Sequence, residues 1–481
     1  MRASVSTPHR SVDVAIIGAG TAGLAAYRAA VASTPRVVLI ESGAYGTTCA
    51  RVGCMPSKLL VAAADVAHTA RRAAKFGIGC AVEVDGRAVM DRVRRERDRF
   101  VGMAVEDVKR IPEEHRLVGR ARFMGAEASG ARMLEVEGER ICARAVVIAT
   151  GSSPFVPPIF DAVRDRVVVN DDVFEWTTLP QSVAVFGTGV LGLELGQALH
   201  RLGVRVRLFG RSGTVGRLTD PVVRAAAEAA FHSELALDSK ARVHSVNRDG
   251  DGVAVTFDDA SGTSRVERFG LVLVATGRRP HFEGLALELA GVKLDKDGSP
   301  HVSRATLQCG NTPVFVAGDA SHGAPLLHEA ADDGKIAGAN AVRYPRVQPG
   351  PRRTSLEITF SDPQIAIVGA SFEDLSRVGE LIIGEVSFVD QGRSRILGQD
   401  RGAARVYADP ASGRFLGAEI AGPRAEHLGH LLSWAHQSDL TIGEMLAMPF
   451  YHPVVEEGLR TALKDASAKL EALDSEQHFT R

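Results

Sequence analysis

The same strand–turn–helix–strand pattern occurs twice in the chain, each time with three glycines at the turn. In the first copy, the apolar run Val14 to Ile17 precedes the glycines, and a second apolar run ends at Glu41. The second copy begins at Ser182, and its second apolar run ends at Phe209. The glycines keep the same spacing: Gly18, Gly20 and Gly23, then Gly187, Gly189 and Gly192. This pattern predicts two doubly wound domains with parallel strands.

The three glycines of each copy have separate expected tasks. The first permits a tight turn, the second lets the backbone approach a pyrophosphate, and the third lets the helix pack close to the strand. The helix N-terminus then presents unpaired N–H groups and a partial positive charge to the phosphates. Each copy therefore predicts a dinucleotide site. The alternative is two glycine-rich turns in a plain sheet that binds no ligand.

The residue that ends the second apolar run distinguishes the two sites. In the first copy it is Glu41, whose carboxylate can accept hydrogen bonds from an adenosine ribose. The equivalent position in the second copy is Gly210, and Arg211 and Arg217 follow it. Two cations in place of an acid suit a 2′-phosphate, so the second site is predicted to favour NADP(H) over NAD(H). Alternatively, both arginines are solvated loop residues and nucleotide selectivity is loose.

Two cysteines lie close together in the segment Gly46 to Lys58, GTTCARVGCMPSK. The separation of Cys49 and Cys54 can bring their sulfurs within disulfide range across one helical turn, and a helical pattern begins at about Met55. A thiolate near a helix N-terminus is stabilised, so the pair is predicted to be redox-active. The alternatives are two buried thiols or half of a metal site. No second Cys or His pair has zinc-ligand spacing, so no metal is predicted.

The rest of the chain divides at two proline-rich stretches, 154–158 and 345–351. Before the second stretch, a third apolar strand, Val314 to Ala317, leads into Gly318 and Asp319. After it the periodicity changes to that of an α+β domain. Strand-like segments there are 357–360, 365–368, 381–389 and 404–407, and helix-like segments are 427–436 and 456–463.

The charge of the chain is balanced, with 57 Lys and Arg against 58 Asp and Glu and a formal net charge of −1. That balance predicts no nucleic-acid or membrane partner, and no apolar run approaches the roughly 20 residues that span a bilayer. The segment Met1 to Asp13 lacks the apolar core of a signal peptide, so a cytoplasmic protein is expected. Outside the close pair, Cys80, Cys142 and Cys309 are interpreted as structural residues.

Taken in order, these motifs resemble those of the class I pyridine nucleotide-disulfide oxidoreductases, a family that includes dihydrolipoamide dehydrogenase, glutathione reductase and mycothione reductase. The resemblance covers essentially the whole sequence. The cysteine segment with Pro56-Ser57-Lys58 has the dihydrolipoamide dehydrogenase form, and the first glycine triplet resembles the FAD site of the family. The other matching segments are Thr150-Gly151, Thr276-Gly277, Gly318-Asp319 with 325–328, and Tyr451-His452-Pro453 with Glu457.

The resemblance implies a set of catalytic residues. Cys54 is implied to be the thiol next to the flavin, and Cys49 the thiol that exchanges with the substrate. Lys58 and Glu194 are implied to pair near the flavin N5, although they could be a plain ion pair. An acid/base histidine is implied to reach across from the second subunit, with a glutamate that orients it, so a homodimer is expected. These two residues are His452 and Glu457.

The resemblance also implies cofactor residues and a division of the chain. The fold class is α/β, with two doubly wound Rossmann-like dinucleotide-binding domains and a C-terminal α+β dimerisation domain. Segments 1–153 and 281–349 would form the FAD domain, 154–280 the NAD(P) domain and 350–481 the interface domain. FAD would contact Gly18, Gly20, Gly23, Glu41, Thr48, Lys58, Gly119, Thr150, Gly151, Asp319, Pro325, Leu326, Leu327 and His328. The pyridine nucleotide would contact Gly187, Gly189, Gly192, Arg211, Arg217 and Gly277.

Three functions follow from these expectations. The first is a dihydrolipoamide dehydrogenase-like enzyme that exchanges electrons between a dithiol or lipoyl substrate and NAD(P). The second is an NADPH-dependent reductase of another low-molecular-weight disulfide, similar to glutathione or mycothione reductase. Arg28 falls where glutathione reductases carry a substrate-binding arginine, but Phe100 and Val108 do not match, so Arg28 is interpreted as a surface helix residue. The third is a non-catalytic, redox-sensing flavoprotein, against which the intact cysteine, histidine and glutamate motifs argue.

Overall fold

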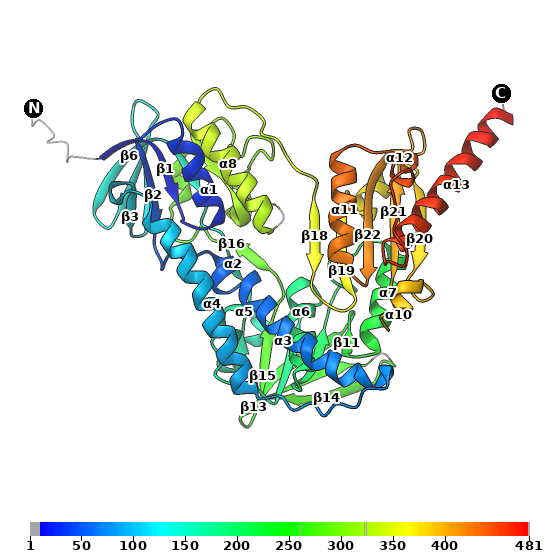
Figure 1. Ribbon diagram of the computed structural model, residues 1–481. Coiled ribbons are helices and arrows are strands. Elements are labelled where there is room, and N and C mark those ends of the chain that lie inside the picture. Colours follow the sequence, from blue (N-terminus) through cyan, green and yellow to red (C-terminus); the bar gives the residue numbers. More distant parts are fainter. Residues whose placement is uncertain (1–9, 260, 322, 324, 480–481) are drawn as a thin grey trace, which may run out of the picture. The chain divides into compact units, whose positions relative to one another are not determined.

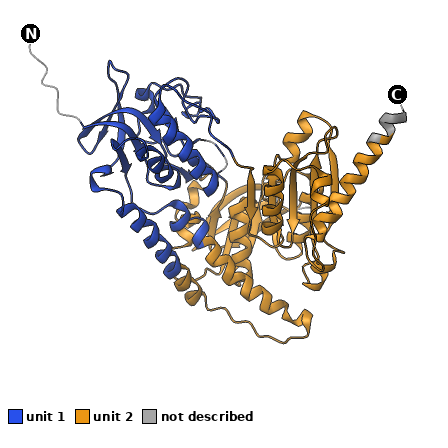
Figure 2. Ribbon diagram, turned by 45° about the horizontal axis from the view of Figure 1, so that its top comes forward, with its two compact units in different colours: residues 1–56, 94–155, 277–352 blue, residues 57–93, 156–276, 353–481 orange. Residues whose placement is uncertain are grey.

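The computed structural model describes residues 10–259, 261–321, 323 and 325–479, which form two compact units (Figure 1, Figure 2). Unit 1 comprises Met1–Pro56, Arg94–Phe155 and Gly277–Arg352, and unit 2 comprises Ser57–Val93, Val156–Thr276 and Arg353–Arg481. Residues 1–9 of the N-terminal segment, on which the cytoplasmic expectation rests in part, lie outside the described residues.

Unit 1 is built on a seven-stranded sheet in the order β3-β2-β1-β6-β5-β4, with β17 also paired to β6. The central strands β2, β1, β6 and β17 run parallel, whereas β5 and β4 form an antiparallel extension. Its strands are β1 (Arg10–Ile17), β2 (Val37–Glu41), β3 (Arg116–Val118), β4 (Ala121–Ala126), β5 (Arg132–Val136), β6 (Glu139–Ile148) and β17 (Val314–Val316). The predicted parallel unit around the first glycine triplet is therefore confirmed.

Two helices of unit 1 pack at backbone contact distance. A Cβ at Gly334 in α8 (Leu327–Arg343) would lie 2.1 Å from the carbonyl oxygen of Ala22 in α1 (Thr21–Val31), and one at Gly338 would lie 2.3 Å from that of Ala26. The glycines of α8 thus receive the alanine-rich face of α1. The other elements here are α2 (Thr48–Arg51), η2 (Glu113–His115), η4 (Leu287–Ala290), η5 (Gly318–Ser321), and the antiparallel pair β7 (Ser152–Pro154) and β16 (Arg278–Pro280).

Unit 2 contains the second parallel sheet, in the order β11-β10-β9-β15-β8, and an antiparallel sheet of β12, β13 and β14. These strands are β8 (Val167–Val168), β9 (Ser182–Phe186), β10 (Arg205–Phe209), β11 (Ala236–Asp238), β12 (Arg242–Asp249), β13 (Gly252–Asp258), β14 (Ser264–Phe269) and β15 (Leu271–Val274). The accompanying helices are α5 (Asn170–Val173), α6 (Val190–Arg201), α7 (Pro221–His232), η1 (Ala73–Phe76) and η3 (Pro158–Arg166). The second copy of the nucleotide-binding pattern therefore also has its predicted topology.

The C-terminal part of unit 2 is an antiparallel sheet in the order β18-β19-β22-β21-β20, packed with helices (Figure 1). Its elements are β18 (Leu356–Thr359), β19 (Gln364–Gly369), β20 (Ile382–Ser387), β21 (Ala403–Ala408), β22 (Phe415–Gly422), α9 (Phe372–Val378), α10 (Gly392–Ile396), α11 (Ala425–Gln437), α12 (Ile442–Leu446) and α13 (Glu457–Phe479). The α+β fold class of this region is confirmed. The periodicity missed β22 and the helix α4 (Gly86–Lys109), which runs across the division between the units.

Candidate active site

The two cysteines lie on either side of a short step, residues 52–53, between the helices α2 and α3. Thr47 begins the first segment, since its Oγ1 accepts a hydrogen bond from Ala50 N at 3.2 Å and caps α2. A Cβ at Gly53 would lie 3.1 Å from Cα of Cys49 and 3.0 Å from the carbonyl oxygen of Thr48. The absence of a side chain at Gly53 therefore permits this close turn, after which α3 (Cys54–Arg72) begins.

This arrangement differs in one respect from the expected one. The cysteines are not one turn apart on a single helix: Cys49 lies in the four-residue α2, and Cys54 is the first residue of the 19-residue α3. Cys49 is half-buried and Cys54 is exposed. The partial positive charge at the start of a long helix favours a thiolate at Cys54 over one at a mid-helix position.

Lys58, on the same helix as Cys54, forms an ion pair with Glu194 of α6 at 2.7 Å (Nζ to Oε2). The Glu194 side chain is 0% exposed and that of Lys58 is 33% exposed. The second carboxylate oxygen, Oε1, accepts a hydrogen bond from Phe360 N at 2.8 Å, and the Lys58 ammonium lies 4.8 Å from the Phe360 ring centroid. Each carboxylate oxygen thus has its own donor. Phe360 was not predicted, because backbone donation leaves no sequence signal.

The face of α6 that carries Glu194 continues into a buried charge cluster. Gln197 accepts a hydrogen bond from Asp362 N at 2.8 Å, and Arg201 donates to Asp362 Oδ2 at 2.8 Å and to Glu234 Oε1 at 2.6 Å. The Arg201 side chain is only 3% exposed. These bonds fix the 360–362 loop against α6, so they also hold Phe360 N at the Glu194 carboxylate.

Replacing Arg201 with methionine is expected to lower the free energy of unfolding by about 3 kcal/mol at pH 7, because it leaves buried carboxylates with fewer partners. Burial alone raises the pKa of Asp362, but ion pairs with Arg401 and Arg201 outweigh burial and lower that pKa to about 2. The folded value is below the ordinary 3.8, so this carboxylate stabilises the fold above about pH 4 and its contribution is lost as the pH falls through 2.

Urea unfolding from pH 7 to pH 2.5 measures both effects, and the deficit of the variant should shrink toward the acidic end. The matched control is Arg164→Met, since Arg164 is 62% exposed and pairs with Asp161 at 3.8 Å. An exposed pair contributes about 0–1 kcal/mol. An equal loss in both variants, at every pH, would contradict the assigned role of the cluster.

The two glycine triplets have matching geometries. Gly18 has φ 105° and Gly187 has φ 118°, conformations that favour glycine. A Cβ at the third glycine of either triplet would lie within 1.9 Å of the first glycine's carbonyl oxygen, whereas one at Gly20 or Gly189 meets no atom within 4 Å. The first and third glycines are therefore required by packing, and the second faces open space, as a close approach of pyrophosphate requires.

The first glycine triplet also has the acidic residue that was expected at the end of its second strand. Glu41 ends β2, and its Oε2 accepts a hydrogen bond from Ala19 N at 2.8 Å while Oε1 accepts from Gly43 N at 2.9 Å. Thr150 follows β6 in the chain. Its side-chain oxygen, Oγ1, is buried and has no hydrogen-bond partner within the described residues. An open glycine, an oriented acid and an orphaned hydroxyl fit a bound dinucleotide such as FAD.

Two consecutive hydrogen bonds within unit 1 hold the side chain of Asp319. Ser152 Oγ donates to Asp319 Oδ2 at 2.8 Å, and Arg278 Nε donates to Ser152 Oγ at 2.8 Å. The remaining predicted FAD residues lie on four segments. Thr48 begins α2; Gly119 follows β3; Gly151 follows β6; Pro325 and Leu326 precede α8; Leu327 and His328 begin it.

The second nucleotide site departs from the first at the end of its second strand. Gly210 follows β10, and Arg211 is exposed. Arg217, in contrast, is in an ion pair with Glu357 of β18, with Nε 3.1 Å from Oε2. Gly277 lies in unit 1, directly before β16. The two predicted cations thus differ in their contacts: Arg211 is exposed, whereas Arg217 is held in an ion pair.

His452 and Glu457 are in direct contact. His452 Nδ1 lies 3.0 Å from Glu457 Oε1 and 3.1 Å from Oε2, and Val454 N donates to the same carboxylate. Hydrogen bonds from the His452 ring and from Val454 N lower the pKa of Glu457. Because a carboxylate only accepts, Nδ1 carries the proton, and Nε2 is left as the basic nitrogen. The His452 side chain is 81% exposed.

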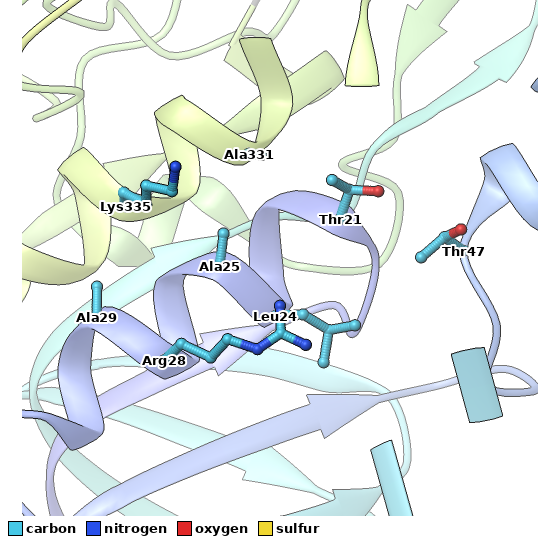
Figure 3. A pocket seen from close by; sticks show the side chains of 8 residues that line it. All are labelled: Thr21, Leu24, Ala25, Arg28, Ala29, Thr47, Ala331 and Lys335. Carbon is cyan, nitrogen blue, oxygen red and sulfur yellow. The ribbon is translucent and has the colours of Figure 1, made fainter. Parts of the chain in front are cut away.

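A cavity of about 420 Å³ lies between α1 and α8 in unit 1 (Figure 3). Two cations, Arg28 and Lys335, are on its wall, together with Thr47, the residue that caps the cysteine-bearing α2. Arg28 was expected to be a plain surface residue, and Lys335 was not singled out. The other lining residues are Thr21, Leu24, Ala25, Ala29 and Ala331.

The described part of the chain has no helix long and apolar enough to cross a bilayer. Within the same residues, no group of three or more His, Cys, Asp or Glu side chains could hold a metal ion.

Known proteins resemble this chain along nearly its whole length. The dihydrolipoyl dehydrogenase of Halobacterium salinarum is 31% identical, over 94% of this chain and 96% of that protein. That of Thermus scotoductus is 30% identical, over 94% and 97%. A mercuric reductase of Shigella flexneri is also 30% identical, over 94% of this chain and 80% of that protein.

Solved structures share the fold. LpdA of Mycobacterium tuberculosis superposes with a TM-score of 0.80 at 24% identity, over 94% of this chain and 99% of that one. The HOCl-induced flavoprotein disulfide reductase RclA of Escherichia coli gives 0.77 at 21%, over 94% and 99%. Residues 12–334 match the pyridine nucleotide-disulphide oxidoreductase family and residues 356–463 match its dimerisation domain. The chain therefore belongs to this family, and it is an FAD-dependent disulfide oxidoreductase that uses a pyridine nucleotide.

Proposed function

We propose that the enzyme exchanges two electrons between a dithiol/disulfide pair and NAD(P) through Cys49 and Cys54, and that dihydrolipoamide is its first candidate substrate. The observation that carries the proposal is the close turn at Gly53, where the backbone before α3 lies against Cys49. Two relatives that match nearly the whole chain are named dihydrolipoyl dehydrogenases, which supports the choice of substrate.

The chemistry of the cysteine pair is thiol–disulfide exchange. A substrate thiolate attacks Sγ of Cys49 in the Cys49–Cys54 disulfide, the S–S bond breaks, and Cys54 leaves as a thiolate. The second substrate thiol then displaces Cys49, so the substrate leaves as a disulfide and both cysteines remain reduced. Bound FAD would supply the two-electron carrier between this pair and the nicotinamide.

His452 would accept the proton of the incoming thiol at Nε2, since Glu457 holds Nδ1. The exposed ring lies in the segment that matches a dimerisation domain, which supports a homodimer in which His452 serves the other subunit. In the same proposal, segments 1–153 and 281–349 bind FAD, 154–280 binds NAD(P), and 350–481 forms the interface. The Lys58–Glu194 pair would lie near the flavin, with Lys58 supplied by the FAD-binding part of the chain and Glu194 by the NAD(P)-binding part.

Steady-state kinetics of the purified holoenzyme with dihydrolipoamide and either NAD or NADP tests the proposed substrate. Turnover that depends on dihydrolipoamide is the expected result with at least one nucleotide. Negligible turnover with both nucleotides, in an enzyme that still reduces a dye with NAD(P)H, would reject dihydrolipoamide and leave the disulfide chemistry in place.

The cavity between α1 and α8 favours a second candidate function, the reduction of a low-molecular-weight anionic disulfide. Arg28 and Lys335 give its wall two positive charges, and Lys335 forms an ion pair with Asp332 at 3.3 Å. Thr47 connects this wall to the helix that carries Cys49. Cations at that position would attract carboxylates of a substrate.

Substitution of Arg28 with alanine distinguishes the two substrate classes. If the substrate is anionic, KM for it should rise about tenfold with little change in kcat, because a charge-assisted contact that holds the ground state is lost. Arg28→Lys keeps the charge and should recover most of the affinity. KM values for an anionic disulfide and for neutral lipoamide, measured side by side, give the answer. Equal effects on both substrates would contradict a charge-based role for Arg28.

A further inference from the structure

The acid position of the second nucleotide site has no room for a side chain. A Cβ at Gly210 would lie 2.5 Å from Thr188 Oγ1 and 2.6 Å from the carbonyl oxygen of Ser239. Gly210 N also donates to Asp238 O at 2.6 Å, which holds the loop after β10 against the end of β11. A ribose-binding carboxylate like Glu41 therefore cannot stand at this position.

Those contacts bring an unpredicted cation to the loop. Gly213 N donates to Ser239 O at 2.8 Å, so the next residue, Lys240, lies against the loop. A Cβ at Gly213 would lie 2.4 Å from Cε of Lys240 and 3.1 Å from its Cγ, which shows that the lysine stem crosses the glycine. The ammonium nitrogen is one bond beyond Cε, over the same loop that carries Arg211.

The three cationic side chains of this region, Arg211, Arg217 and Lys240, differ in whether they form ion pairs. Arg217 is paired with Glu357, whose side chain is only 15% exposed. Arg211 and Lys240 are both exposed, and neither side chain forms a hydrogen bond or ion pair within the part of the chain that the structure describes. Both follow parallel, adjacent strands, whose carboxyl ends form the ligand edge of a doubly wound sheet.

We infer that Lys240, together with Arg211, binds the 2′-phosphate of NADP(H), and that Arg217 takes no part. A phosphate between a guanidinium and an ammonium gains charge-assisted hydrogen bonds from both. The inference depends on the proposed function only in that the second glycine triplet binds the pyridine nucleotide. Two acids lie nearby: Asp238, whose Oδ1 accepts a hydrogen bond from Lys240 N at 3.1 Å, and Glu228, whose carboxylate accepts one from Ser239 Oγ.

Calorimetric titration of the holoenzyme with 2′,5′-ADP and with 5′-AMP tests the assignment, because the two ligands differ in the 2′-phosphate alone. The wild type should bind 2′,5′-ADP at least about tenfold more tightly. Lys240→Met keeps the stem over Gly213 but removes the charge, and it should reduce that preference about tenfold without weakening 5′-AMP. Lys240→Arg should restore it, and Arg211→Ala should act like Lys240→Met.

Arg217→Ala is the matched control, and it should leave the 2′-phosphate preference unchanged. Loss of the preference in Arg217→Ala but not in Lys240→Met would overturn the inference. Equal binding of both ligands by the wild type would overturn it as well, and would favour a ribose contact from Asp238. None of these readings requires disulfide turnover, so failure here is distinguishable from failure of the proposed dithiol chemistry.

Discussion

Replacement of Cys49 with serine is expected to reduce disulfide turnover by roughly a thousandfold or more, because serine oxygen neither forms the disulfide nor leaves as a thiolate. Reduction of an artificial dye by NAD(P)H should be retained, since this reaction needs the two nucleotide sites but not the thiol of Cys49. Parallel assays of the two activities on one preparation measure the effect.

The control for this variant is Cys80→Ser. Cys80 is exposed like Cys54 but lies outside the cysteine segment, so its replacement should change neither activity. If Cys49→Ser kept full disulfide activity, the exchange chemistry assigned to Cys49 would be wrong. Loss of both activities together would instead point to a fold or cofactor defect, which the visible flavin spectrum reports.

Replacement of His452 with glutamine is expected to lower dithiol turnover by about 10²- to 10⁴-fold at neutral pH, the usual contribution of a positioned general base. The defect should shrink at high pH, because a substrate thiol with an ordinary pKa near 8.5 then ionises without help. Full pH–rate profiles of the wild type and the variant measure both features. Dye reduction should again be unaffected.

Glu457 and a distant histidine provide the controls for that experiment. Glu457→Gln removes the carboxylate that holds Nδ1, and it should reduce turnover by about tenfold to a hundredfold, less than loss of the ring itself. His427→Gln changes a histidine that is also largely exposed, at 61%, and should have no effect. A pH-independent defect in His452→Gln would contradict a proton-transfer role.

The parallel sheets and both glycine cradles were predictable from sequence, because their signals are local. Gly18 and Gly187 are required by positive φ angles, and Gly23 and Gly192, which follow five residues later, by contact with a carbonyl oxygen. Such constraints act within one strand–turn–helix unit, so the spacing alone reports them. Glu41 was found for the same reason: it ends a strand that pairs directly with β1.

Features made by long-range contacts were not predictable. Phe360 reaches Glu194 through its backbone, and Lys240 reaches the Gly213 loop through pairing of β10 with β11. The ion pair between Arg217 and Glu357 likewise depends on packing between β18 and the loop after β10. These partners are far apart in the sequence, so no local periodic pattern indicates the contacts between them.

The most direct test of the central claim is a count of thiols in the air-oxidised holoenzyme. Alkylation followed by peptide mass spectrometry, before and after addition of NAD(P)H, reports the state of Cys49 and Cys54. The peptide should carry an intramolecular disulfide and no alkyl group before reduction, and one alkyl group on each cysteine afterwards. Alkylation of both cysteines before any reductant is added, or of neither after NAD(P)H, would contradict a redox-active pair at these positions.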